Sequence, residues 1–464
     1  MVRPTQIGLL PLYLELYDEV RPEARPDMES FAARVASVLS GLGMEVKSAP
    51  VLTRHVAIQR EVQRMTDDAA LDALATLHLA YSPSLEAVET LVASDRPLLL
   101  LDTTPAPSFG VDADAERMFR NHGIHGVQDL SCMLRRRGKS YLLSVGHVDD
   151  ARFHDDVRLN CRAMRASRAM NTMRVLSIGE AFGGMGDFSV DRHVLSAKLG
   201  VQVQHETVDT LAEYAREVNE EQISQEARDD GHRCDCSTVD AKALARTNRL
   251  GLAVRRMMAA SGAGAVTFNF ASFTRNHGVE TVPFLEASKV MTRGQGYAGE
   301  NDVLTAALVG ALAQAGCRLT FTEMFCPDWE GNTIFMSHMG ECGLDVAENA
   351  ALVEKTYAFS DVSNPVIAVP KIKPGYATLV NIAPGAHDSF MLIGARVEVL
   401  DRGPVAGFPD VPHFWLRPAS GDIREFLHAY SNIGGTHHLA LCLGDETELV
   451  QRMATVMGLT YREI

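Results

Sequence analysis

The hydrophobic positions in the first third of the chain alternate between two spacings. "QIGLLPLYL" (6–14) is an apolar run of strand length. The next apolar residues recur at helical spacing and stop before Gly43: Phe31, Val35, Val38, Leu39 and Leu42. Further strand-like runs are "EVKSAPVL" (45–52), "ALATLHLAY" (73–81) and "RPLLLLDTT" (96–104). Strands separated by helices of this length predict parallel βαβ units, with both faces of the sheet covered.

The same pattern restarts after a long helical segment, 149–173. Strand candidates are "RVLSIG" (174–179), "VQVQHET" (201–207) and "GAVTFNF" (264–270), and the helices expected with them cover 208–227, 239–260 and 301–316. This half of the pattern predicts a second α/β domain.

From about Leu319 the pattern changes to short strand-like runs punctuated by Pro and Gly. These runs cover 319–325, 333–338, 366–370, 376–383, 389–400 and 413–418. Short helices are expected at 421–430 and 446–457. This part is typical of an antiparallel sheet or barrel. A chain of 464 residues is expected to form two or three domains, and we place them at 1–170, 171–318 and 319–464.

Composition narrows the classes of partner. The hydrophobic fraction of 46% and the charged fraction of 22% are those of a soluble globular protein. A formal charge of −15 without a Lys/Arg-rich run argues against a nucleic-acid partner. No apolar run approaches the roughly 20 residues that span a bilayer, so no membrane partner is expected. The eight cysteines lack a disulfide-framework spacing, which favours reduced thiols and a cytoplasmic location.

Two glutamates stand at the ends of predicted elements. Glu300 lies at the start of the apolar helix that begins near Asn301, where a carboxylate could simply complement the helix dipole. Glu323, in "LTFTEMF", shares the two-residue period of Phe321 and Phe325 and so points to the face that those aromatic rings occupy. A buried carboxylate there is costly unless a cation or a proton partner meets it.

Histidines follow both glutamates along the chain. His338 lies in "IFMSHMGE", and "GGTHH" contains His437 and His438. Because neighbouring side chains of a strand face opposite sides, only one of these two adjacent histidines is expected to face any given site. Singly, each of these residues is more often structural than functional. Together, two carboxylates and two imidazoles at element ends match a divalent-ion site with oxygen and nitrogen ligands, the kind that suits Mn²⁺, Co²⁺ or Mg²⁺.

Three further patterns are weaker indications of a functional site. "GHRCDC" offers His232, Cys234 and Cys236, but this spacing fits no standard zinc site. "SIGEAFGGMGDF" (177–188) follows a strand without the order of a P-loop or a dinucleotide fingerprint, so it is interpreted as a turn that lines a site. His122 and His125 lie three residues apart, where exposed histidines are common.

Four short segments, taken in order, resemble the signature segments of the L-arabinose isomerase family. They are "GYAGEND", "FTEMF", "SHMGE" and "GGTHH", against GYAGEGD, FMEDY, SHMLE and GG(T/A)HH in the family. Upstream, "LSVGHVDD", "LHLAYSPS" and "HGIHGVQD" resemble family segments as well, so the resemblance covers most of the chain. It implies two α/β domains followed by a β-barrel domain, in agreement with the pattern described above.

The resemblance also implies a site and a reaction. Glu300, Glu323, His338 and His438 would bind a divalent ion, usually Mn²⁺, and His437 would be left to pack, to support the site or to contact the substrate. The two glutamates would form the acid–base pair of an aldose–ketose isomerisation through an ene-diol. The metal would polarise the oxygens at C1 and C2, and a positioned carboxylate would move the proton from C2 to C1. No organic cofactor or nucleotide is implied.

The family builds its site between subunits of a homo-oligomer, a hexamer. A neighbour's amino-terminal domain would then close over the sugar and offer His125, with Tyr81 to Ser84 near the substrate. A homo-oligomer, hexameric or based on trimers, with a shared active site is therefore expected.

The sequence departs from the family around the substrate. Leu14, in "YLELYD", stands where the family has a sugar-contacting glutamine, and Phe182 or Met185 aligns with its methionine. "FTEMFCPDW" replaces FMEDYTYHF. Because the metal residues are kept, the favoured hypothesis is an isomerase with an altered sugar substrate. The alternatives are a metal-dependent epimerase or aldolase on a related sugar, and a non-catalytic sugar-binding protein.

Overall fold

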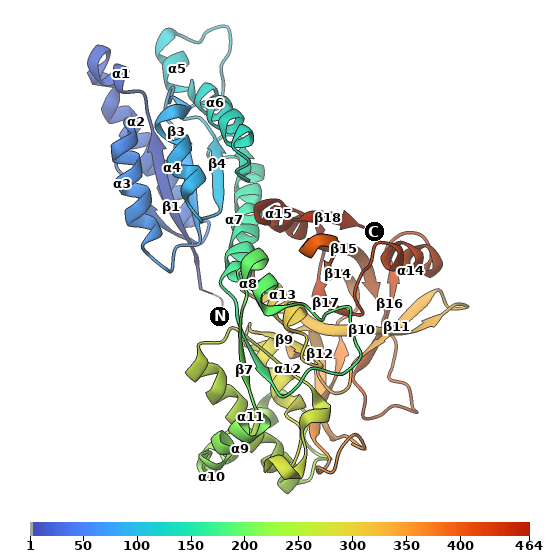
Figure 1. Ribbon diagram of the computed structural model, residues 1–464. Coiled ribbons are helices and arrows are strands. Elements are labelled where there is room, and N and C mark those ends of the chain that lie inside the picture. Colours follow the sequence, from blue (N-terminus) through green and yellow to red (C-terminus); the bar gives the residue numbers. More distant parts are fainter. Residues whose placement is uncertain (1–2) are drawn as a thin grey trace. The chain divides into compact units, whose positions relative to one another are not determined.

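The computed structural model describes residues 3–464, which form two compact units (Figure 1). The barrel unit comprises Ala169–Gln451 and Leu459–Ile464. The amino-terminal unit comprises the residues up to Arg168 together with Arg452–Gly458. The domain boundaries at residues 170 and 318 remain predictions from the sequence.

A five-stranded parallel sheet forms the centre of the amino-terminal unit, in the order β2-β1-β3-β4-β5. Its strands are β1 (Thr5–Leu12), β2 (Met44–Ser48), β3 (Ala73–His78), β4 (Leu98–Asp102) and β5 (Leu142–Val145). Its helices are α1 (Glu15–Val20), α2 (Arg25–Gly41), α3 (His55–Thr66), α4 (Val88–Ala93), α5 (Ala115–Arg120), α6 (Gly123–Arg136) and α7 (Ala151–Asn171). This strand order is that of a doubly wound α/β fold.

Both faces of the sheet are buried along its central strands β1, β3 and β4, which explains the continuous apolar runs of these strands. In β1, Ile7 and Leu9 pack in one core with residues of α2 and α7. Leu10 and Leu12 pack in another core with residues of α3, α4 and α6. A strand covered on both sides needs apolar residues at successive positions, as parallel sheets do.

A four-stranded parallel sheet opens the barrel unit, in the order β7-β6-β8-β9. Its strands are β6 (Arg174–Ile178), β7 (Gln202–Glu206), β8 (Ala265–Phe268) and β9 (Gly296–Gly299). The helices are α8 (Arg192–Leu199), α9 (Val208–Arg216), α10 (Glu220–Arg233), α11 (Ala241–Ser261), α12 (Phe284–Thr292) and α13 (Val303–Gln314). The helix expected at 208–227 is two helices, because Asn219 and Gln222 form a capping box that starts α10.

The rest of the barrel unit contains a closed antiparallel barrel of six strands, in the order β14-β17-β10-β11-β16-β15, closed by the pairing of β14 with β15. These strands are β10 (Leu319–Asp328), β11 (Thr333–Ser337), β14 (Gly375–Pro384), β15 (Phe390–Val399), β16 (His413–Pro418) and β17 (His438–Leu443). β18 (Thr460–Glu463) pairs with β15, and β12 (Ala347–Glu354) pairs with β13 (Val366–Ile372). The helices are α14 (Ile423–Asn432) and the start of α15 (Thr447–Met457), whose residues from Arg452 on belong to the amino-terminal unit. The predicted fold class is confirmed.

A network of buried charges joins α10, α11 and α12. The Lys289 ammonium lies 2.5 Å from Asp230 Oδ1 and 2.8 Å from Glu226 Oε1, and it donates to Asn248 Oδ1 at 3.2 Å. Arg255 adds a second cation to Glu226 at 2.7 Å. Burial raises the pKa of Asp230, whereas Arg255 and Lys289 overcome the effect of burial on Glu226 and lower its pKa to about 2. The three helices therefore depend on paired charges as well as on apolar packing.

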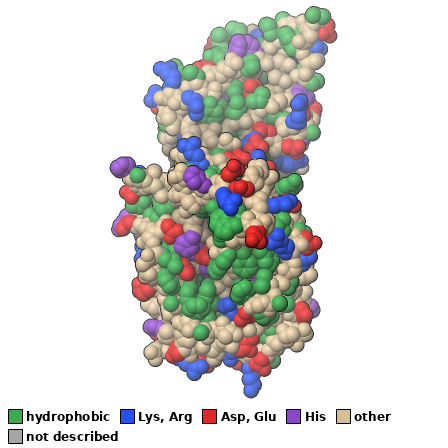
Figure 2. Space-filling model, turned by 90° about the vertical axis from the view of Figure 1, so that its right-hand side faces the viewer, with side chains coloured by type: hydrophobic (Ala, Val, Ile, Leu, Met, Phe, Trp, Pro, Cys, Tyr) green, Lys and Arg blue, Asp and Glu red, His purple; other side chains and the backbone are tan. Residues whose placement is uncertain are grey.

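The surface of the barrel unit includes large exposed hydrophobic side chains, among them Phe325, Trp329, Phe359 and Phe408. Figure 2 shows hydrophobic side chains gathered on one face of this unit. Within residues 3–464, no helix combines the length and apolarity needed to cross a membrane. None of the eight cysteines, all within this range, is in a disulfide.

Candidate functional site

Glu300 lies where the carboxyl ends of the parallel strands of the barrel unit meet. β9 ends at Gly299, and Glu300 and Asn301 follow with φ angles of 59° and 69°. A left-handed backbone is uncommon for residues other than glycine. The Asn301 amide holds this turn against the end of β6 by donating to the Gly179 carbonyl at 2.6 Å. The carboxyl ends of such strands, where ligands of open α/β sheets bind, therefore include Glu300.

Strand register in the barrel places Glu323 against a histidine. In the β10–β17 pair, Glu323 lies directly opposite His438, and in the β10–β11 pair it lies opposite Ser337, the residue before His338. Glu323 Oε1 is 2.9 Å from His438 Nε2 and 3.4 Å from His338 Nε2. Residues opposite each other in neighbouring strands are within contact distance, so the pairing of the strands itself builds this part of the site.

Four side chains form one compact group of possible metal ligands. Glu300, Glu323, His437 and His438 each offer an atom within 4.8 Å of the others, the one such group found among residues 3–464. His438 Nε2 is 3.8 Å from Glu300 Oε2, and His437 Nε2 is 3.7 Å from the same oxygen. The expectation that only one of the two adjacent histidines would face the site does not hold. β17 begins at His438, so His437 precedes the strand and does not follow its alternation.

His338 contacts this group through Glu323. Its ring packs against Gly299, where an added Cβ would come within 2.5 Å of His338 Cε1, so only glycine fits at that position. Phe321 supports both barrel imidazoles, with ring centroids 4.6 Å from His338 and 4.8 Å from His438. The structure thus brings Glu300, Glu323 and His438 together and places His338 beside them.

Each of the three imidazoles has a carboxylate on its Nδ1 atom. The pairs are His438 with Asp302 at 2.9 Å, His338 with Glu341 at 2.7 Å, and His437 with Asp187 at 2.6 Å. A carboxylate that accepts the Nδ1 proton fixes the ring and leaves Nε2 for another ligand, as second-layer carboxylates do in metal sites. The sequence did not predict these roles, although Asp302 and Glu341 stand inside the signature segments.

Asp302 has a second role in the local fold. Its Oδ1 accepts the Thr305 N–H at 2.9 Å and so caps the amino-terminal end of α13. Its Oδ2 lies 2.9 Å from His438 Nδ1. One side chain therefore links the start of α13 to the orientation of an imidazole in the barrel.

Neighbouring charged groups outweigh burial in the pKa values of Glu323, His338 and His437. Burial alone would raise the pKa of Glu323, but His338 and His438, whose Nε2 atoms lie 3.4 Å and 2.9 Å from its carboxylate, hold that pKa well below its usual range. Burial likewise lowers the pKa of His338, yet Glu341 and Glu323 outweigh it and raise that pKa. The pKa of His437 rises to about 9, because the nearby carboxylates of Glu300 and Asp187 outweigh burial.

The group fits a divalent cation. Glu300 Oε2 and His438 Nε2 are buried and have no hydrogen-bond partner. The close contact of His438 Nε2 with Glu323 lacks hydrogen-bond geometry. Unpartnered buried polar atoms are costly, and a cation would satisfy both. Two carboxylates and two imidazoles form the mixed ligand set of Mn²⁺, Co²⁺ or Zn²⁺ sites, and Mg²⁺ takes the carboxylates.

The glycine-rich segment after β6 covers part of the group. The Phe182 N–H donates to the Glu300 carbonyl at 3.3 Å, and Phe188 stacks on His438 with ring centroids 5.1 Å apart. Phe182, Met185, Phe188 and Asn301 line a cavity of about 190 Å³. Both residues that could align with the family methionine thus line the same space.

Three predicted substrate residues belong to the amino-terminal unit. Leu14 is half-buried and precedes α1. The Tyr81 hydroxyl donates to Asp129 Oδ2 at 3.4 Å. His125 is exposed in the first turn of α6, with its ring centroid 4.2 Å from that of His122. Their contact with a sugar stays a prediction.

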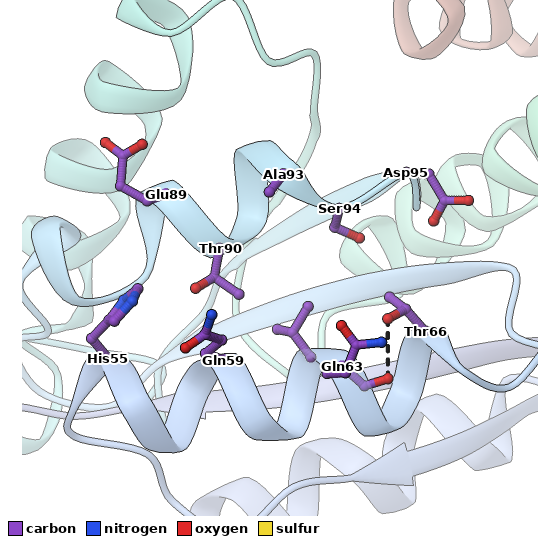
Figure 3. A pocket seen from close by; sticks show the side chains of 10 residues that line it. His55, Gln59, Gln63, Thr66, Glu89, Thr90, Ala93, Ser94 and Asp95 are labelled. Atoms are coloured by element: carbon purple, nitrogen blue, oxygen red, sulfur yellow. Dashed lines mark hydrogen bonds between the residues drawn. The ribbon is translucent and has the colours of Figure 1, made fainter.

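Another cavity, of about 360 Å³, lies between α3 and α4 of the amino-terminal unit. Figure 3 shows His55, Gln59 and Thr66 on one side of it and Thr90 on the other. None of the residues predicted to form the site lines it.

In the "GHRCDC" segment, the Cys236 thiol donates to the Cys234 carbonyl at 3.6 Å.

Comparisons with known proteins agree with this architecture. The L-arabinose isomerase central domain matches residues 174–317, and the L-arabinose isomerase C-terminal domain matches residues 318–460. An L-arabinose isomerase of a Nocardioides species is 26% identical, over 94% of this chain and 89% of its own length. Those of Herpetosiphon aurantiacus and Mycolicibacterium smegmatis are each 23% identical, over 83% and 97% of this chain and 78% and 90% of their own lengths. The two matched domains cover more than half of the chain, which therefore belongs to the L-arabinose isomerase family of aldose–ketose isomerases.

Proposed function

We propose that this chain is a metal-dependent aldose–ketose isomerase that acts through an ene-diol. The proposal rests on the convergence of Glu300, which follows β9, with Glu323 of β10 and His438 of β17. Two of their buried polar atoms, Glu300 Oε2 and His438 Nε2, have no hydrogen-bond partner. These residues stand in the segments that resemble the family signatures.

The two glutamates are the proposed acid–base pair. One carboxylate takes the proton from C2 of the aldose, exchanges it with solvent in part of the turnovers and delivers a proton to C1, and the other moves a proton from the oxygen at C2 to the oxygen at C1. General acid–base catalysis of this kind typically contributes a factor of about 10²–10⁴ in rate. His437 Nε2, 3.7 Å from Glu300 and 3.8 Å from Glu323, is near enough to donate to a sugar oxygen placed between them.

Glu300, Glu323, His438 and the adjacent His338 are the proposed ligands of the cation, with Mn²⁺ favoured and Co²⁺ or Mg²⁺ as alternatives. When bound, such a cation polarises the carbonyl and hydroxyl oxygens of the sugar. The carboxylates on the Nδ1 atoms of His338 and His438 keep the ligand rings in place.

We also propose that the sugar differs from L-arabinose. Leu14 cannot replace the hydrogen bonds of an amide, and an unpaired buried hydroxyl costs about 1–3 kcal/mol. Two further differences from the family sequence lie next to Glu300 and Glu323. One is the segment that contains Phe182 and Met185, and the other is the part of β10 beyond Glu323, where a bulge leaves Phe325 exposed. They change the surroundings of the sugar and leave Glu300 and Glu323 in place.

The isomerase proposal is tested by assaying the purified chain with Mn²⁺ against a panel of aldoses in deuterated water. The expected result is a ketose product carrying deuterium at C1, with activity lost on chelation and restored by Mn²⁺. NMR of the product distinguishes the alternatives. A C2 epimer or a cleaved carbon skeleton would indicate an epimerase or an aldolase, and sugar binding without any exchange at C2 would indicate a non-catalytic protein.

A homo-oligomer is proposed on the basis of exposed apolar side chains. Leu16, Val20, Phe109 and Met118 are each at least half exposed in the amino-terminal unit, the unit that contains Tyr81 and His125. Light scattering should give a mass of three or six times 50.6 kDa. A mass of 50.6 kDa for an active sample would rule out a site shared between subunits.

A further inference from the structure

Asp187 and His437 form a pair that joins the segment after β6 to the segment before β17. One carboxylate oxygen of Asp187 accepts the backbone N–H of His437 at 2.9 Å and also contacts its Nδ1 atom at 2.6 Å. The two residues are 250 positions apart. Two bonds from a single oxygen fix the imidazole relative to its own backbone, so the ring can take one orientation only.

The backbone at His437 is held by other contacts. Tyr430 donates its hydroxyl to the Thr436 carbonyl, and the Thr436 N–H donates to Asn381 Oδ1 at 3.3 Å. Gly435 packs against the Tyr430 ring, where an added Cβ would lie within 2.3 Å. Loss of the Asp187 carboxylate would therefore free the His437 ring without releasing the turn that carries it.

The opposite ring nitrogen of His437 faces the glutamates. Its distances of 3.7 Å to Glu300 Oε2 and 3.8 Å to Glu323 Oε1 are too long for hydrogen bonds. The side chain of His437 is 38% exposed, whereas that of His438 is fully buried. His437 can therefore be reached by a substrate, and its Nε2 has room to donate to an oxygen lying between the two glutamates.

We propose that Asp187 is a positioning residue for the isomerisation, holding the His437 Nε2–H toward a sugar oxygen beside Glu300 and Glu323. This inference rests on the proposed function. His438 needs no such residue from this segment, since the β17 register and Asp302 already fix its ring. Asp187 acts through His437 and does not itself contact the sugar.

The test compares Asp187→Ala with Asp187→Asn in steady-state kinetics. Alanine should lower kcat by about 10- to 100-fold, the usual cost of losing such an outer partner, with bound Mn²⁺ unchanged. Asparagine places an oxygen that can accept the same two bonds, so it should recover most of the lost kcat. The matched control is Asp209→Ala, which removes a 3.1 Å contact of the same type, with His277, elsewhere in this unit.

A double-mutant cycle with His437→Gln separates positioning from a general structural effect. If Asp187 acts through His437, adding Asp187→Ala to His437→Gln should lower kcat no further. Equal losses in both backgrounds, or an unchanged kcat in Asp187→Ala alone, would overturn the inference.

A readout that does not need turnover keeps this inference distinct from the proposed function. In NMR spectra of the imidazoles, the hydrogen-bonded Nδ1 proton of His437 should be present in the wild type and in Asp209→Ala and absent in Asp187→Ala. A wild type that converts no aldose would refute the proposed function. An Nδ1 signal that is unaffected by Asp187→Ala would refute the role of Asp187.

Discussion

Glu323→Gln is expected to lower kcat for isomerisation by about 10²–10⁴, the range that general acid–base catalysis typically contributes. Glutamine keeps the size of the side chain but cannot take a proton from C2. Glu323 has 15% of its side chain exposed and lies against the Nε2 atoms of His338 and His438. The change therefore acts where the proton would move, and the strand register around it is kept.

Loss of activity could also come from loss of the cation, so bound Mn²⁺ is measured on the same samples. Retention of Mn²⁺ with the low kcat would assign the loss to proton transfer. The matched control is Glu398→Gln, which neutralises another barrel carboxylate, one that pairs with Arg417 at 2.8 Å on the barrel surface. Activity of Glu323→Gln equal to that of Glu398→Gln would contradict the assignment of Glu323.

Most of the strands could be predicted from the sequence, because each one buries a continuous or alternating apolar run. β9 could not, since its four residues, "GYAG", include two glycines and no β-branched residue. Gly296 is required there by packing: a Cβ would meet the Ala306 carbonyl of α13 at 2.0 Å. The split between α9 and α10 depends on one capping box, which a hydrophobic period does not reveal.

The residues of the candidate site that could be predicted are those in the short segments that resemble the family signatures. Glu300, Glu323 and His438 meet because strand ends and strand register bring those segments together. The position of His437 was not predictable from alternation, because the strand starts one residue later. Asp187 lies far away in sequence in a glycine-rich turn, and only the folded chain shows that its carboxylate contacts an imidazole.

Lys289→Met is expected to lower the free energy of unfolding by about 3–5 kcal/mol, the cost of removing one partner from a buried ion pair. The residue is 3% exposed, and its ammonium lies between Asp230 and Glu226. Glu226 would still have Arg255. Asp230 would keep only the Asn248 amide, at 2.7 Å, and so would become a buried charge without a cation.

The pH dependence and a second substitution check that this uncompensated carboxylate is the cause. Burial already raises the pKa of Asp230, and removing Lys289 takes away a charge that lowers it. In this pH range the folded variant should bind a proton that the unfolded chain does not. The difference in free energy of unfolding between the variant and the wild type, measured in urea, should therefore shrink as the pH falls from about 7 to about 5. Lys289→Met/Asp230→Asn should recover part of the loss, and Lys198→Met, at an exposed position on α8, should change stability by no more than about 0.5 kcal/mol. If the loss of free energy of unfolding were the same at every pH and Asp230→Asn recovered none of it, the cause would instead be lost packing around the lysine side chain.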